Sequence, residues 1–308
     1  MKKYLFSLLI VCLFACETVI YPELDQPAEI LVVDAWLIQG QPSQLIKITR
    51  SQSYFETAAP SLVHGAQVTV SDLETGDQYA FVDSDSGYVW TAAEAFGTIG
   101  NTYQLTIEFE GQTFEATAHL GDVPEIDSLV FRHNPEDFNI LESYYSAEFF
   151  ARDLEGVGNA YWIKTWKNGS FLNKPSEINI ALDAGMGSGQ DVDGLVFHQA
   201  IRKDHINPLE ERPDRANYYY PPYDIGDSIY VEIHSIDEAA FDYLTAVKIQ
   251  TNRPGGFSEL FAVPLANVTT NLRNMDPTSN TAIAGFFNVS AVSSASAQLT
   301  EELAQQLK

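Results

Sequence analysis

Segment 183–194 has the residue types and spacing that metal binding requires. It reads DAGMGSGQDVDG, with Asp183, Asp191 and Asp193 set among four glycines. Carboxylates separated by flexible glycines can wrap oxygen ligands around calcium. The spacing does not fit an EF-hand, because an alignment on Asp191 and Asp193 places Gly189 at the first ligand position. We favour a flexible turn with solvated acids, and a calcium site formed by the three aspartates is the alternative.

The stretch 217–223 could contact a ligand or a partner. It reads NYYYPPY and contains Tyr218, Tyr219, Tyr220 and Tyr223. Tyrosine offers a large contact area at a low cost in conformational entropy, and proline stiffens the chain. Packing inside the protein is the favoured interpretation. Contact with a sugar, a peptide or another protein is the alternative, and the four tyrosines are its candidate residues.

Patterns typical of enzymes do not occur in the sequence. The six histidines form no His-x-x-x-His or His-Glu-x-x-His pair of the kind that holds zinc on one helical face. A Gly-x-Ser-x-Gly nucleophile elbow is also missing. The 42 acidic residues are too numerous for any one pair of carboxylates to indicate glycoside hydrolysis. We therefore expect a protein without catalytic activity and without a cofactor.

Cys16 closes a four-residue pattern at 13–16, Leu-Phe-Ala-Cys, that resembles the lipobox of bacterial lipoproteins. Two lysines and the apolar run 4–14 precede it. That run is too short to span a hydrocarbon core of roughly 30 Å, so it is typical of a signal peptide. The resemblance implies cleavage after Ala15 and acylation of Cys16, which would tie the mature chain to a membrane. The alternative is an ordinary secretory signal with an incidental cysteine.

The charge of the chain excludes one class of partner. Its 17 basic and 42 acidic residues give a net charge of −25, and removal of the two lysines of the signal leaves 15 − 42 = −27. A polyanion repels phosphates and gains nothing from counterion release, so nucleic acid is not expected as a partner. No basic surface is expected to hold the protein on anionic lipid, so the lipid on Cys16 would supply the attachment.

Apolar and polar residues alternate with a period of two through the first third of the chain. In 102–109, Tyr103, Leu105 and Ile107 point to one face, and the residues between them point to the other. Turn residues separate seven strand-like runs, of which 29–38 is more continuously apolar, and together they predict an immunoglobulin-like antiparallel β-sandwich over 28–122. The runs are 29–38, 44–50, 66–72, 78–82, 87–91, 102–109 and 114–118.

Strand-like runs return after Pro124 with wider spacing, which predicts a second β-rich domain over 123–295. Ser235 and Glu238 have the spacing of a capping box. Phe241, Leu244 and Val247 follow on one face of one packing helix. The expected strands are 128–133, 144–152, 160–167, 195–202, 227–236 and 281–290. The remaining segments are a signal peptide at 1–15, the lipidated cysteine and tether at 16–27, and a tail at 296–308 in which a short helix is one interpretation.

The order and spacing of several short motifs resemble a family of Bacteroidota lipoproteins catalogued as domain of unknown function 4249. The motifs are ILVVDAW at 30–36, HGAQV at 64–68, GY at 87–88, IDSL at 126–129, DLEGVGNAYW at 153–162, DG at 193–194, SID at 235–237 and GFF at 285–287. The resemblance covers nearly the whole mature chain. It implies an accessory role beside TonB-dependent outer-membrane transporters and offers no catalytic residues.

These observations lead to one expected function and two alternatives. We expect an outer-membrane lipoprotein that faces the cell exterior and captures or gates a nutrient beside a TonB-dependent transporter. The first alternative is an adhesin or envelope scaffold in which the sandwich is a spacer. The second is an enzyme acting on glycans or peptides, which would require a pocket of carboxylates with shifted pKa values.

Overall fold

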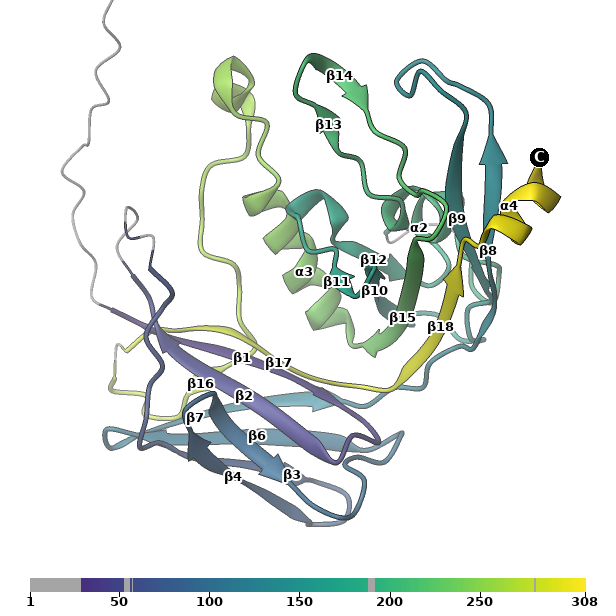
Figure 1. The fold of residues 1–308 in the computed structure, drawn as a ribbon. Coiled ribbons are helices and arrows are strands. Elements are labelled where there is room, and N and C mark those ends of the chain that lie inside the picture. The colour runs from purple at the N-terminus through teal and green to yellow at the C-terminus, as the bar shows by residue number, and fades with distance from the viewer. Residues whose placement is uncertain (1–28, 53–55, 57, 188–191, 280) are drawn as a thin grey trace, which may run out of the picture.

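The computed structural model describes residues 29–308 except 53–55, 57, 188–191 and 280. Two β-rich modules lie one above the other, with the N-terminal module below and the second module above (Figure 1). The lipobox with Cys16, the tether, and Asp191 of the alternative calcium site fall outside the described residues.

Seven strands form in the N-terminal module where alternation of apolar and polar residues predicted them. They are β1 (Leu31–Ile38), β2 (Ser43–Arg50), β3 (Gln67–Asp72), β4 (Gln78–Ser84), β5 (Gly87–Thr91), β6 (Thr102–Phe109) and β7 (Gln112–His119). In β6, Tyr103, Leu105 and Ile107 are all fully buried, and the residues between them face outward. The period of two therefore separates a core face from an outer face, as expected for a half-buried strand.

The strands of this module form one nine-stranded path that curls around a core. Its order is β16-β7-β6-β3-β4-β5-β2-β1-β17, with β16 at Arg273–Asn274 and β17 at Ile283–Ser290. β4 turns the sheet over, because its first half pairs with β3 and its second half with β5. β17 packs against β7, so the two ends of the path meet. The predicted mainly β, sandwich-type fold is confirmed.

β17 joins the N-terminal module although it comes from the segment expected to form the second domain. It pairs in parallel with β1 from Leu31↔Ile283 to Ile38↔Ser290. Phe287 lies in the core of the N-terminal module, and Phe286 packs into the cluster between the modules. A strand covered on both faces carries apolar residues at consecutive positions. The N-terminal module is therefore not limited to residues before the expected boundary at 122, because a strand from near the C-terminus completes its sheet.

The second module is built on a five-stranded sheet and a separate hairpin. The sheet runs β11-β10-β15-β18, with β12 on the same edge of β10 as β11, and β8 and β9 form the hairpin beside β18. The strands are β8 (Ile126–Asn134), β9 (Tyr144–Ala151), β10 (Ala160–Lys167), β11 (Ser170–Phe171), β12 (Asn179–Leu182), β13 (Glu211–Arg212), β14 (Arg215–Tyr219), β15 (Ser228–Ile236) and β18 (Val292–Gln298). The helices are η1 (Pro175–Glu177), α2 (Gln199–Arg202), η2 (Asp204–Ile206), α3 (Glu238–Thr251), η3 (Gly256–Phe261) and α4 (Glu301–Leu307).

The strand expected at 195–202 is wrong, because the helix α2 occupies its second half. The His198 side chain accepts a hydrogen bond from the Ala200 amide and caps this helix. Ile201 is fully buried, and its carbonyl accepts a hydrogen bond from the Asn179 side chain. The apolar residue that suggested a strand is buried from a short capped helix instead.

The packing helix α3 is confirmed, but its expected cap is wrong. Asp237 is the N-cap, and its side chain accepts a hydrogen bond from the Ala240 amide. Ser235 lies in β15 instead, where its hydroxyl donates to the Gly121 carbonyl. Phe241 and Leu244 are buried against the sheet, as the pattern predicted. None of the helices in the described part of the chain has the length and apolar character needed to cross a bilayer.

Candidate functional site

Three of the four candidate tyrosines lie on or next to the hairpin of β13 and β14. The guanidinium of Arg215 lies 4.0 Å from the ring centre of Tyr218, and that of Arg212 lies 4.8 Å from the ring of Tyr220. Tyr220 is 41% exposed. Tyr219 lines a hollow of about 380 Å³ between this hairpin and the tip of the β8–β9 hairpin. These tyrosines therefore lie where a partner can reach them.

Tyr223 belongs to the core, so its assignment as a contact residue is corrected. It is 1% exposed, and its hydroxyl donates to the Ile206 carbonyl at 2.7 Å. Its ring meets that of Phe131 edge-on at 5.4 Å. Burial raises the pKa of its phenol, so the hydroxyl stays neutral and keeps its hydrogen. Packing is the role of this tyrosine, and a surface partner cannot contact it.

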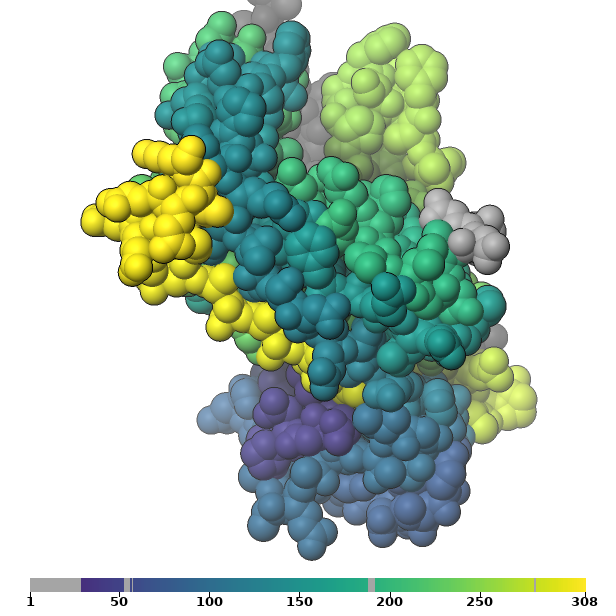
Figure 2. Space-filling model, turned by 90° about the vertical axis from the view of Figure 1, so that its right-hand side faces the viewer, coloured from purple at the N-terminus to yellow at the C-terminus, as the bar shows by residue number. Residues whose placement is uncertain are grey.

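Three protruding segments stand at the end of the second module, and we call them the apical tips. They are residues 135–143 between β8 and β9, residues 209–220 around the β13–β14 hairpin, and residues 253–265 around η3. All three point away from the N-terminal module (Figure 1), and the space-filling view shows them standing clear of the body (Figure 2). They carry exposed apolar side chains that are 41–88% accessible: Phe138, Leu141, Leu209, Tyr220, Phe257, Leu260, Phe261, Val263 and Leu265.

The η3 tip holds its apolar side chains outward on a braced turn. Arg253 forms an ion pair with Glu259 and donates to the Val263 carbonyl at 2.8 Å. The rings of Phe257 and Phe261 contact each other at 5.7 Å, and these side chains are 77% and 79% exposed. Exposed apolar side chains gathered on one turn are typical of an interaction surface.

An acidic cluster gathers at the base of loop 183–194. Atoms of Asp153, Asp183 and Asp193 lie within 4.8 Å of one another. The sequence indicated Asp183 and Asp193 but missed Asp153, which comes 30 positions before Asp183 and whose relation to them depends on the fold. The first two members, Asp153 and Asp183, are buried, and Asp193 is exposed.

The carboxylates of this cluster accept hydrogen bonds that tie loop 154–159 to loop 183–194. Asp183 accepts from the amides of Gly158 and Asn159 at 2.7 and 3.1 Å. Asp193 accepts from the Gly156 amide at 2.9 Å. Burial raises the pKa of Asp153, and the charges of its two partners raise it further. The cluster can thus act as a clasp between loops without an ion.

We predict that Asp193→Asn raises the melting temperature slightly at pH 7. The substitution retains the oxygen that accepts from Gly156 and removes one negative charge facing Asp153. Because the folded pKa of Asp153 lies above 3.8, its ionisation opposes folding at neutral pH and this penalty disappears as pH falls. We expect a gain of about 0.5 kcal/mol, or 1–2 °C, measured by calorimetry without divalent ions.

The exposed Asp214→Asn is the matched control and is expected to leave the melting temperature unchanged. A melting temperature that rises with added calcium in the natural protein, and not in Asp193→Asn, would contradict the clasp and support a calcium site.

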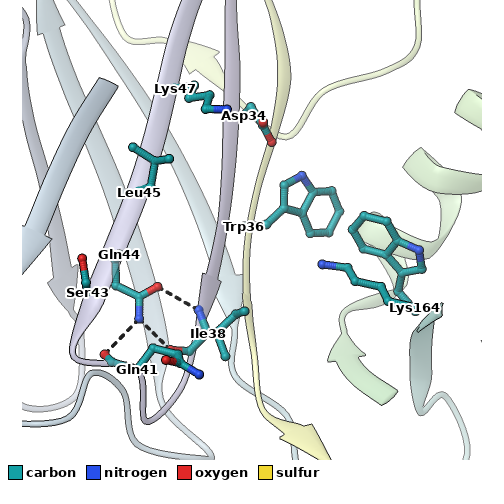
Figure 3. Close-up of a pocket in the computed structure, with 10 residues that line it drawn as sticks. Asp34, Trp36, Ile38, Gln41, Ser43, Gln44, Leu45, Lys47 and Lys164 are labelled. Atoms are coloured by element: carbon teal, nitrogen blue, oxygen red, sulfur yellow. Dashed lines mark hydrogen bonds between the residues drawn. The ribbon is translucent and has the colours of Figure 1, made fainter. Parts of the chain in front are cut away.

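A cleft of about 490 Å³ lies between the two modules, lined by β1 and β2 below and by β10 above. Side chains alternate between the two faces of a strand. Asp34 and Trp36 therefore both project from the outer face of β1, and Trp162 and Lys164 both lie on one face of β10. Figure 3 shows Trp36 and Lys164 converging from the two sides. The motifs of the sequence give no sign of this cleft, because it forms only where the two modules meet.

The fold and these surfaces define a mainly β protein of two modules with an apolar end and a cleft between the modules. The chain belongs to the family described as domain of unknown function (DUF4249), whose sequence model matches residues 17–296. No curated protein matches it.

Proposed function

We propose that this chain is a Bacteroidota lipoprotein of the outer membrane that faces the cell exterior and assists a TonB-dependent transporter without catalysing a reaction. Its anchor would be the acyl chains on Cys16, whose surroundings match a lipobox. Several chains anchor a protein stably where one gives only marginal binding. Capture or gating of a nutrient is the role that this placement would serve.

The apical tips are the observation that carries the proposal. Exposed apolar residues are normal when scattered, but here they gather on three segments at one end of the molecule. Arg212 and Arg215 stack on tyrosines of the same end, and aromatic and arginine side chains are enriched at protein interfaces. A protein partner in the same membrane, such as the transporter, is the occupant that this end would meet.

Co-isolation from outer membranes tests this proposal. Tagged protein extracted in mild detergent is expected to bring a TonB-dependent transporter with it, as identified by mass spectrometry. Cys16→Ala is expected to release the protein from the membrane fraction. The triple variant Phe257→Ser, Leu260→Ser and Phe261→Ser is expected to stay in the membrane and lose at least nine-tenths of the transporter, on the order of 1.4 kcal/mol or more.

The control is Leu73→Ser with Val82→Ser, which removes exposed apolar side chains from the N-terminal module. It should retain the transporter in full. A natural protein that is extracted as a lone monomer, or a Cys16→Ala variant that remains bound to membranes, would contradict the proposal.

A further inference from the structure

The ammonium group of Lys164 projects into the cleft between the modules without a hydrogen-bond acceptor. Among the described residues it has no hydrogen bond and no ion pair, and its close contact is the Trp162 ring at 4.0 Å. Glu232 stands directly opposite on β15, but its carboxylate accepts from Tyr230 and His234 and forms no ion pair with Lys164. A partly buried ammonium with free donors favours an anionic ligand.

Two tryptophans form the apolar wall beside this ammonium. The rings of Trp36 and Trp162 meet edge-on at 5.0 Å, and Trp36 stacks on Phe286 at 5.7 Å. These contacts hold the indoles in place before any ligand arrives. A preorganised aromatic wall suits a flat ring or the apolar face of a sugar, because binding then requires little ordering.

Polar side chains line much of the rest of the cleft, beside Ile38 and Leu45. Asp34 and Lys47 lie directly opposite each other on β1 and β2, so charges of both signs stand at this end of the cleft. At the other end the Gln44 amide donates to the carbonyls of Ile38 and Gln41 and shapes the turn between these strands (Figure 3). The cleft volume of about 490 Å³ falls in the range of small-molecule sites.

From these contacts we infer that the cleft binds a small ring-bearing carboxylate, with the carboxylate on Lys164 and the ring against Trp36 and Trp162. An acidic sugar and an aromatic acid share this chemistry. The inference deepens the proposed function, on which it rests for its biological meaning, by naming the class of molecule captured. The site itself is a property of the isolated chain.

Calorimetric titration of the purified full chain tests the inference with three probes: glucuronate, glucose and phenylacetate. Glucuronate is expected to bind at least tenfold more tightly than glucose if the source is an acidic sugar, and phenylacetate will bind more tightly than both if it is an aromatic acid. Lys164→Met keeps the aliphatic stem on Trp162 and is expected to weaken carboxylate binding at least tenfold. Lys164→Arg keeps the charge and should restore it, and Lys174→Met, outside the cleft, should bind like the natural protein.

The pH dependence gives a second readout. Burial lowers the pKa of Lys164 to about 8, against the attraction of Glu232 and Asp34. The other groups on the packed elements are Lys47 on β2, Tyr243 on α3 and His234 on β15, and burial lowers the pKa of His234 to about 4. The affinity for carboxylates should therefore fall about tenfold between pH 7 and pH 9 as Lys164 loses its proton. In Lys164→Arg the affinity should stay constant over this range.

Three results would overturn the inference: no binding of either carboxylate, glucose binding as tightly as the more tightly bound carboxylate, or an unchanged affinity for that carboxylate in Lys164→Met. Because these titrations need no transporter, their failure would leave the co-isolation result standing. Failure of the co-isolation would likewise leave a measured carboxylate site in place.

Discussion

Gly285→Ala is expected to lower the free energy of unfolding by about 3–5 kcal/mol, a large share of the stability of an ordinary domain. Gly285 lies in β17 opposite Val33 of β1, with φ at +94°. A Cβ at this position would stand 1.9 Å from the Val33 carbonyl oxygen. The backbone of β1 would have to move, and the parallel ladder that closes the N-terminal module would break. Urea denaturation followed by circular dichroism measures the loss.

Gly111→Ala is the matched control for this substitution. Gly111 also has positive φ, at +76°, but an added Cβ would meet nothing within 4 Å. Only the cost of the backbone conformation remains, about 1–2 kcal/mol. Equal losses in the two variants would contradict a specific role for the close approach of β1 and β17.

The strands of the N-terminal module were predictable because their signal is local. Each of β1 to β7 carries its own apolar pattern and is bounded by turn residues, and each formed at the expected place. The pairing of β1 with β17 was not predictable, since more than 240 positions separate Val33 from Gly285. Apolar residues at consecutive positions in β17 indicate that both faces of the strand are buried, but they do not show which strand lies beside it.

The site was predictable only in part for the same reason. Loop 183–194 showed its acids, but Asp153 joins them through the fold alone. Trp162 and Trp166 are four positions apart on β10, a spacing that places both on one face of the strand, and each contacts a ring of β15 there. Nothing local to Trp36 or Lys164 indicates that the second module covers them. Residue type alone also cannot divide a run of tyrosines into buried and exposed members.

The second large loss of stability is expected for Tyr223→Ala, at the buried tyrosine of this run. We expect it to lower the free energy of unfolding by about 3–5 kcal/mol, as for other large aromatic side chains removed from a core. The cavity would lie against Phe131, and the Ile206 carbonyl would lose the hydroxyl that now donates to it. Tyr223→Phe, which keeps the ring, should lose only about 1–3 kcal/mol. Thermal and urea unfolding measure both variants.

Tyr220→Ala is the matched control, since this tyrosine is three positions away and 41% exposed. Its loss should change stability by no more than about 0.5 kcal/mol, because surface positions tolerate truncation. The two variants should also separate in the co-isolation experiment: Tyr220→Ala folds normally and weakens capture of the transporter, whereas Tyr223→Ala loses the protein through unfolding. A Tyr223→Ala protein with natural stability and reduced capture would mean that the core position assigned to this ring is wrong.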